Sequence, residues 1–493
     1  MAFNSIVYLL FLTIAVIAYY SFSVQFKWIW LLIASIAFYL SFIPVFFLLL
    51  VLIIIMNYFL GKSLARSTDG SNRLISFIIV LNILVLVFFK YFNNIFPGNQ
   101  IHLYFVDFFY RVEPINKMIL PLGLSYIIFT VISYHIEIKR KTIGPEKHFG
   151  YFSLYLLFFP KITQGPIERP QNFLPQLHTS IDLNSASIVD GLKMMLWGYF
   201  KKLVVADRLA IYVNAVYDNS EHHNGPTLLV ATIFFAIQIY ADFSGYTDIA
   251  VGSARLFGIK LTNNFNRPYF STSVKEFWSR WHISLSLWLR DYIFLPLAYV
   301  LSRWMNKQYY LHISKEKWIY LIAIMVTFCI CGLWHGVGWT FLFWGILFGI
   351  FQTYSNWTGE FNKKLRKRFG IRKSSGYYKS YKIIITFCLV CFTWIFFRSN
   401  NLSQAFSIIK NILSFSGKVF FGETSDVMNS MFHSGLAIFL LLTFEIVKEF
   451  YYDRSRFLKS VSWVTKSIFY VFLVIVIIFF GVFDGGQFIY FQF

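Results

Sequence analysis

Long apolar runs separated by short polar stretches follow one another along almost the whole chain. Residues 46–60 and 468–483 are two such runs, and neither contains a charged side chain. Runs of this kind are typical of helices that cross a lipid bilayer. Residues 6–20 form the first run. No basic residue precedes it and it lacks a small-residue cleavage pattern, so we interpret it as a retained span.

The pattern predicts an all-α polytopic membrane protein with about eleven transmembrane helices. Residues 28–61 are long enough for two short passes, with a break at residues 41–44. Residues 150–300 mix short apolar stretches with proline, glycine and charge, which indicates re-entrant or interfacial helices. The other predicted spans lie at residues 74–91, 121–138, 318–334, 338–354, 383–397, 434–447 and 467–482.

Basic residues gather in the short loops between the apolar runs, most densely in residues 361–382. Cytoplasmic loops carry such an excess of lysine and arginine. Counting passes from these loops places both the N-terminus and the C-terminus on the outer face. The chain has no internal repeat and no long linker. We therefore expect a single domain over residues 1–493, with residues 485–493 as an aromatic tail.

Composition narrows the class of protein further. Hydrophobic residues make up 57% of the chain and charged residues 14%, which excludes a soluble globular protein of this size. The net charge of +21 lies in loops and not in an aromatic-and-basic module. We expect the lipid bilayer and its anionic head groups as partners, and no nucleic acid. The four cysteines lack His, Asp or Glu at ligand spacing, so we expect buried thiols and no metal site.

Polar residues at membrane depth are costly, which makes them candidates for function. His335 lies at the junction of two apolar runs, in the stretch CGLWHGVGWTFLFWG. A histidine with a pKa near neutrality can take a proton from a hydroxyl group and return it to a leaving group. A hydrogen-bonded histidine of the protein core is the alternative interpretation of this position.

His282 is a second candidate, within residues 276–297, which we predict as one helix. Helical periodicity places it on an apolar, aromatic face together with Trp278, Trp281, Leu285 and Leu289. On that face, His282 either takes part in the chemistry or packs as part of an interfacial helix.

Two further stretches carry charge within surroundings that look buried. Asp242 and Asp248 lie in IYADFSGYTDIA, and Glu168 and Arg169 lie in FFPKITQGPIERP. For these residues we favour polar networks that fix broken helices over direct catalysis. Phosphate-binding glycine loops, serine elbows and zinc-protease motifs are missing from the sequence. The predicted chemistry is therefore group transfer by histidine acid–base catalysis.

Taken in order, these motifs resemble the bacterial branch of the membrane-bound O-acyltransferase family. The likeness is greatest to alginate O-acetylase-type polysaccharide O-acetyltransferases, and the D-alanyl transfer protein of the teichoic-acid pathway is a more distant relative. It is carried by PLGLSYIIFTVISYHIEI, FFPKITQGPIERP, YADFSGYTDIAVGSARLFGIKLTNNFNRPYF, EFWSRWHISLSLWLRDYIFLP and LWHGVGWTFLFWG. The resemblance implies a ring of tilted helices that encloses a central tunnel.

The resemblance also implies a function. An acetyl group would pass from cytoplasmic acetyl-CoA, as donor substrate, across the bacterial inner membrane toward an alginate-like exopolysaccharide or another cell-surface glycan. His335 matches the family's catalytic histidine, and His282 matches its second signature histidine. No permanently bound cofactor is expected. The sequence has no serine-hydrolase site, so transfer to the polymer would need a separate extracytoplasmic, esterase-like acyltransferase partner.

The tail adds Tyr490 as a third candidate. A small membrane protein of the D-alanylation system ends in an aromatic motif whose tyrosine looks like a relay for the acyl group. Phe488, Tyr490 and Phe493 are similar to that motif in spacing. A phenol needs an adjacent base to act as a nucleophile, which His335 could supply. Anchoring of the tail in the membrane interface is the alternative.

Two other functions stay open from the sequence. One is a D-alanyl transferase that uses a thioester carrier protein. The other is a polytopic transporter or flippase without covalent chemistry. Transporters usually repeat broken helices in two corresponding halves, and the sequence shows no such symmetry.

Overall fold

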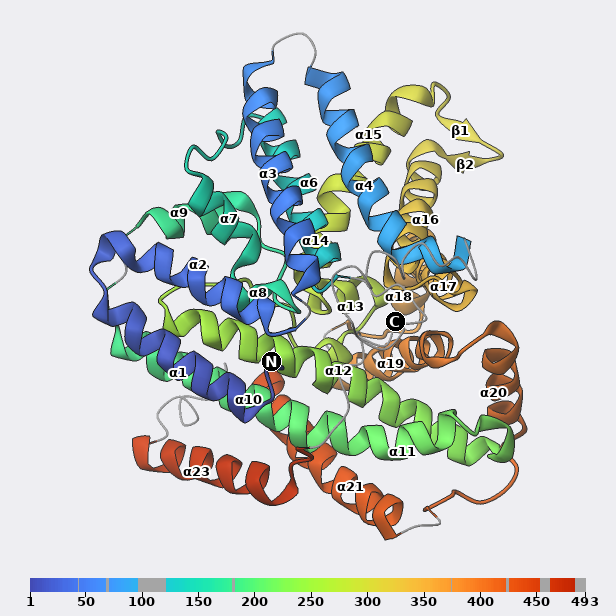
Figure 1. Cartoon of the computed structure of the whole chain (residues 1–493). Coiled ribbons are helices and arrows are strands. Elements are labelled where there is room, and N and C mark those ends of the chain that lie inside the picture. The colour runs from blue at the N-terminus through green and yellow to red at the C-terminus, as the bar shows by residue number, and fades with distance from the viewer. Residues whose placement is uncertain are drawn as a thin grey trace. The chain divides into compact units, whose positions relative to one another are not determined.

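The computed structural model describes residues 1–42, 44–67, 71–95, 121–179, 182–373, 375–422, 425–452 and 462–483. Helices make up almost all the regular structure of these residues (Figure 1), which confirms the predicted all-helical class. One short antiparallel ladder pairs Tyr309 with Ser314 and Tyr310 with Ile313. By its internal contacts the chain forms two compact units, and the expected single membrane-embedded domain stays a prediction.

Unit 1 comprises Met1–Met195 and Tyr246–Thr262. Its helices are α1 (Ile6–Ser21), α2 (Val24–Leu40), α3 (Val45–Arg66), α4 (Ser71–Ile95), α6 (Leu124–Lys139), α7 (Phe149–Leu157), α8 (Phe159–Ile162), α9 (Pro170–His178), most of α10 (Ser185–Tyr199) and the C-terminal end of α12 (Gly225–Leu256).

Within unit 1, a reciprocal pair of carboxamides joins α3 to α4. Nδ2 of Asn57 donates to Oδ1 of Asn82 at 3.1 Å, and Nδ2 of Asn82 donates back to Oδ1 of Asn57 at 3.0 Å. Both side chains are completely buried. Such a pair fixes the register of two apolar helices, which packing alone specifies only weakly.

Unit 2 comprises Leu196–Gly245 and Asn263–Phe493. Its first elements are η1 (Phe200–Ala206), α11 (Asp207–Tyr217), η2 (Ser220–His222), the N-terminal part of α12, η3 (Pro268–Phe270), α13 (Val274–Arg280), α14 (Ile283–Leu289), η4 (Arg290–Phe294) and α15 (Leu295–Trp304). They are followed by β1 (Tyr309–Tyr310), β2 (Ile313–Ser314), α16 (Lys315–His335), α17 (Trp339–Trp357), α18 (Gly359–Arg368), α19 (Gly376–Arg398), α20 (Leu402–Ser414), α21 (Ser425–Ile446), η5 (Val447–Tyr452) and α23 (Trp463–Phe480).

Eight helices of the described residues are long and apolar enough to cross a membrane, and α1 and α2 are shorter apolar helices. The eight are Phe46–Arg66, Asn72–Tyr91, Gly225–Leu256, Ile283–Trp304, Lys315–His335, Gly376–Arg398, Val427–Tyr451 and Trp463–Phe480. A multi-pass membrane protein is therefore confirmed, as is the break predicted at residues 41–44. The total of about eleven spans, the tunnel and the outer placement of the termini stay predictions.

One candidate span, Gly225–Leu256, lies within residues 150–300 and a second, Ile283–Trp304, lies mostly within them, where the sequence pattern indicated re-entrant or interfacial helices. Gly225–Leu256 was missed because serine, threonine, aspartate and glutamine interrupt its apolar pattern. The helix tolerates these residues since 78% of its most apolar window is buried inside the protein. Polar side chains there find protein partners instead of lipid.

α16 and α17 form a close helical hairpin in unit 2. A methyl group at Gly345 would meet the backbone of Phe328, and one at Gly332 would meet the backbone of Phe341. Only glycine lets two helix backbones approach so closely. Gly332, three residues before His335, therefore lets α16 and α17 pack closely.

The structure corrects the prediction of one helix over residues 276–297. α13 ends at Arg280 and α14 begins at Ile283, and between them His282 has a left-handed backbone with φ 41° and ψ 56°. A residue in that conformation cannot continue an α-helix. The predicted burial is confirmed, because no residue of the proposed apolar face is more than 6% exposed: Trp278, Trp281, His282, Leu285 and Leu289.

Candidate functional site

His335 is the last residue of α16 and is buried, with 6% of its surface exposed. The helix ends there because Gly336 turns to an extended conformation. The imidazole ring meets three aromatic rings, with centroid distances of 4.7 Å to Trp334, 5.0 Å to Trp344 and 5.4 Å to Phe397. The predicted catalytic histidine thus lies in a largely apolar, aromatic environment.

His282 lies at the break between α13 and α14 and is also buried. Its ring stands perpendicular to that of Phe243, with the centroids 4.7 Å apart, and lies 6.4 Å from the ring of Trp334. Trp334 is therefore a neighbour of both histidines. The structure brings together the two histidines that the sequence singled out separately, from α16 and from the α13–α14 break.

Four tryptophans form a cluster that contacts His335 through Trp344. The rings of Trp344 and Trp394 stack at 5.9 Å, Trp281 lies 5.2 Å from Trp394, and Trp278 lies 5.8 Å from Trp344. None of the four is more than 6% exposed. Such a cluster keeps bulk water away and strengthens any electrostatic interaction made inside it.

Hydrogen bonds from the loop that follows α12 hold the left-handed histidine on both sides. The N–H of Asn266 donates to the carbonyl of Arg280 at 2.9 Å, and the N–H of Ile283 donates to the carbonyl of Asn264 at 2.9 Å. The side-chain Oδ1 of Asn264 also accepts from the N–H of Ser284 at 3.0 Å. These bonds stabilise a conformation that is unfavourable for a residue other than glycine.

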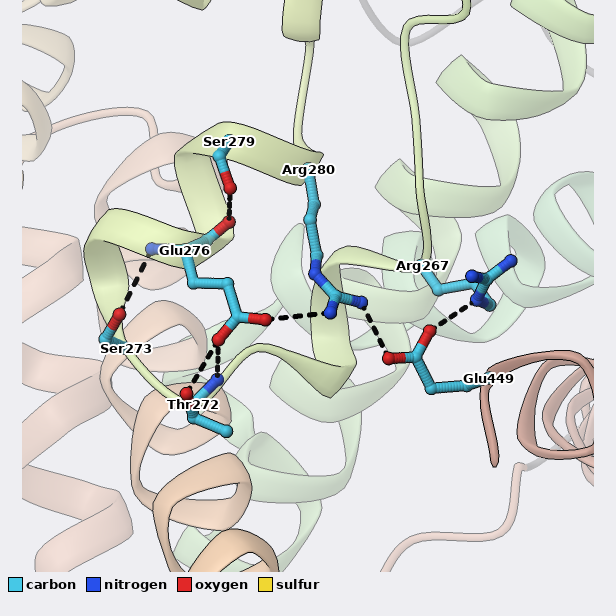
Figure 2. Close-up of polar contacts among 7 residues, drawn as sticks. All are labelled: Arg267, Thr272, Ser273, Glu276, Ser279, Arg280 and Glu449. Atoms are coloured by element: carbon cyan, nitrogen blue, oxygen red, sulfur yellow. Dashed lines mark hydrogen bonds and ion pairs between the residues drawn. The ribbon is translucent and has the colours of Figure 1, made fainter. Parts of the chain in front are cut away.

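An ion-pair cluster fixes α13 directly before this break (Figure 2). Glu449 binds Arg280 at 3.0 Å and Arg267 at 2.6 Å, and Arg280 also binds Glu276 at 2.8 Å. Thr272 donates its N–H and its hydroxyl to Glu276. Burial works to raise the pKa of Glu276, but these hydrogen bonds and the Arg280 guanidinium outweigh it and hold the pKa below its usual value.

Asp242 takes part in a buried charge network. The ammonium of Lys202 lies 2.7 Å from Asp242 and 2.7 Å from Asp207. The neighbouring Lys201 donates to Ser244 at 2.9 Å. Both lysines lie on η1, a π-helical stretch of a kind often retained at functional sites. This arrangement supports the structural interpretation of Asp242.

The other predicted polar residues lie in unit 1. Glu168 is buried and accepts hydrogen bonds from the N–H and the hydroxyl of Thr262, so it ties two segments of unit 1 together. Burial raises the pKa of Glu168, and burial lowers the pKa of the nearby Lys161 to about 7. Arg169 precedes α9, and Asp248 is half-buried on α12. Within unit 1, Glu168 thus behaves as part of a structural network.

Tyr490, with the rest of the tail, lies outside the described residues. Sequence reasoning missed two residues that shape the site: Asn264 and Glu449. Each is a buried or nearly buried polar residue, and only its occurrence among apolar neighbours could have drawn attention to it.

Comparison with known proteins identifies relatives of the chain. Residues 141–398, just over half of it, match the model of MBOAT, the membrane-bound O-acyltransferase family. A probable alginate O-acetylase of Azotobacter vinelandii is 29% identical over 474 residues, which cover 95% of this chain and 88% of the relative. A peptidoglycan O-acetyltransferase of Helicobacter pylori is 30% identical over 421 residues, 79% of this chain and 74% of the relative.

A teichoic acid D-alanyltransferase of Bacillus subtilis is similar over a shorter part. It is 28% identical over 287 residues, which cover 58% of this chain and 70% of the relative. The matched family region contains Asn264, His282, His335 and the four tryptophans.

Proposed function

The chain belongs to the membrane-bound O-acyltransferase family and is an O-acyltransferase, and from that premise we propose that it transfers acetyl groups to a glycan outside the cell membrane. The donor is cytoplasmic acetyl-CoA, and the enzyme lies in the bacterial inner membrane. One observation carries the proposal: His335 and His282 are buried, with ring centroids 4.7 Å and 6.4 Å from that of Trp334.

His335 acts as general base in the proposed reaction. Its ring takes the proton of an acceptor hydroxyl while the hydroxyl oxygen attacks the carbonyl carbon of the thioester. The tetrahedral intermediate expels the CoA thiolate, and the imidazolium returns its proton to the sulfur. A carbon–oxygen bond replaces a carbon–sulfur bond, and no net proton is released.

The surroundings of His335 suit this role. The aromatic rings exclude water, which protects the thioester from hydrolysis. The carbonyl end of α16 stabilises the positive charge that the ring carries between the two proton transfers. His282 positions the donor or stabilises the charge that develops on it.

The names of the relatives support a glycan acceptor. Proteins named for alginate and for peptidoglycan O-acetylation are similar to most of this chain, at 29% and 30% identity. An alginate-like exopolysaccharide and another cell-surface glycan are both acceptors of the same class, since each offers a sugar hydroxyl. Analysis of the acetylated polymer decides between them.

Tyr490 is proposed as a transient carrier of the acetyl group. Its phenol would be activated by His335 and would form an aryl ester, a more reactive acyl donor than an alkyl ester. An extracytoplasmic, esterase-like partner would then pass the group to the glycan. Labelled acetyl-CoA should mark the wild-type protein and not Tyr490→Phe. Equal labelling and equal polymer acetylation in the variant would leave the tail as an interface anchor.

A D-alanyl transferase that uses a thioester carrier protein is the second candidate, favoured by the likeness to the teichoic acid D-alanyltransferase of Bacillus subtilis. The two candidate functions use different acyl donors, acetyl-CoA and a D-alanyl carrier thioester, so an assay with each donor distinguishes them. The purified protein should release CoA from acetyl-CoA and leave a D-alanyl carrier thioester intact. In the native host, His335→Ala should remove the alkali-labile acetate of the surface glycan. Unchanged glycan acetate in that variant would overturn the proposal.

A further inference from the structure

Asn264 is the one buried asparagine in the stretch Asn263–Asn266 of unit 2. It is 1% exposed, whereas Asn263 and Asn266 are exposed. The ring of the adjacent Phe265 packs 5.0 Å from that of Trp281, which places this loop against the aromatic cluster. A buried carboxamide needs partners for both its oxygen and its nitrogen.

The oxygen of Asn264 has a structural partner. It accepts the N–H of Ser284 at 3.0 Å, while the backbone carbonyl of the same residue accepts the N–H of Ile283 at 2.9 Å. His282 occupies the N-cap position of α14, but its side chain makes no capping hydrogen bond. Asn264 therefore caps α14 from another segment, which relieves His282 of the capping role.

The nitrogen of Asn264 has no structural partner among the described residues. Because Oδ1 faces an N–H group, turning the carboxamide over would oppose two donors, and this identifies the buried atom without a partner as Nδ2. Nδ1 of the neighbouring His282 is likewise buried without a hydrogen bond to any other described residue. Buried polar atoms are usually hydrogen-bonded, so these two atoms indicate a place where a polar ligand binds.

The other buried polar groups of the tryptophan cluster indicate which hydrogen-bonding groups a ligand would need. The indole N–H groups of Trp278, Trp344 and Trp394 also lack hydrogen-bond acceptors among the described residues. Indole and carboxamide N–H groups only donate. The cluster therefore suits a small ligand with an acceptor oxygen and little positive charge, such as the carbonyl of a thioester.

We propose that Asn264 is a substrate-contacting residue whose Nδ2–H donates to the carbonyl oxygen of the acyl donor beside His282. This inference rests on the proposed function. During attack by the acceptor hydroxyl, the carbonyl oxygen gains the electron pair of the C=O π bond, and Nδ2–H stabilises that charge until the carbon–sulfur bond breaks. Loss of one such donor lowers kcat by about 10²-fold.

The test compares two ligands that differ in the carbonyl. Acetyl-CoA and the thioether S-ethyl-CoA are titrated into purified full-length protein in nanodiscs. We expect the wild type to prefer acetyl-CoA about 10-fold, the value of one hydrogen bond to a buried donor. Asn264→Asp keeps the capping oxygen and removes the N–H donor. Its ratio of affinities for acetyl-CoA and S-ethyl-CoA should therefore fall to about 1. The neutral Asn264→Ala removes the donor and the cap together, and its preference should fall to about 1 as well.

Asn263→Asp is the matched control, since it makes the same change at an exposed position of the same loop, and it should keep the wild-type preference. A preference retained in both Asn264 variants, or missing from the wild type, would overturn the inference and reduce Asn264 to a helix cap. Acetyl-CoA that neither binds to the wild type nor reacts with it would instead overturn the proposed function, and the inference with it.

Discussion

His335 and His282 contact the same indole ring, yet different forces hold them. His335 ends α16 in a hairpin that closes through Gly332 and Gly345, and its ring packs against three aromatic rings. His282 sits in a strained backbone turn that Asn264 and Asn266 hold with hydrogen bonds. Packing is tolerant of pH and salt but not of added volume, whereas a polar network responds in the opposite way.

This difference has a functional meaning. The proposed base needs a dry, fixed ring, which a close helix hairpin provides. His282 has a left-handed backbone conformation that an α-helix does not allow, and hydrogen bonds from Asn264 and Asn266 hold it in that conformation. Substitutions should therefore separate chemistry, backbone conformation, packing and charge as four independent contributions.

The largest expected effect is on the chemistry at His335. His335→Ala removes the proposed base, so transfer of acetyl to the surface glycan should fall by about 10³-fold. The thermal unfolding temperature should change little, since the ring makes aromatic contacts that its neighbours can partly replace. His433→Ala is the control, because His433 is a half-buried histidine of α21 that contacts Phe480. Glycan acetate and membrane abundance are measured for both.

At His282, chemistry and backbone can be separated by two variants. Asparagine tolerates the left-handed conformation, so His282→Asn should fold normally and lose about 10²-fold in kcat. His282→Ala should lose activity to the same degree and also about 1 kcal/mol of stability, the added cost of a left-handed alanine. Equal stability of the two variants would show that the turn does not depend on the residue at this position.

A larger side chain in the α16–α17 hairpin, which holds His335, should destabilise the protein. Gly345→Ala places a methyl group against the backbone of Phe328 and should cost about 2 kcal/mol as α16 and α17 separate. Gly359→Ala is the matched control, since a methyl group there meets open space. Thermal unfolding in detergent compares the two. A stability loss that is equal in both would contradict the close hairpin.

Removing the charge of Glu449 should destabilise the ion-pair cluster that holds α13 next to His282. Glu449→Gln weakens the bonds to Arg267 and Arg280 shown in Figure 2 and should cost about 1.5 kcal/mol at low salt. This difference from the wild type should shrink at high salt, because salt screens the wild-type ion pairs. Glu360→Gln, at an exposed ion pair with Lys363, should have no effect. A stability loss in Glu449→Gln that is the same at low and at high salt would show that the charges of this cluster do not hold α13 in position.

Much of the fold could be predicted from the sequence, because a long apolar run is typical of a membrane-crossing helix wherever it occurs. The break at residues 41–44 and the burial around His282 were predicted in that way. The helix break at His282 was not predicted. It depends on hydrogen bonds from residues 264 and 266, and the spacing of apolar residues carries no information about such bonds. Asn264 was missed for a related reason: a buried and an exposed asparagine look alike in one sequence.

The central claim is that His335 carries the proton in acyl transfer. Its most direct test sets binding against turnover in purified His335→Ala: the Kd for acetyl-CoA by calorimetry, and the rate of acetyl transfer under saturating donor. The account predicts an unchanged Kd and a transfer rate lower by about 10³-fold. Transfer at the wild-type rate, or a loss explained entirely by weaker binding, would contradict it.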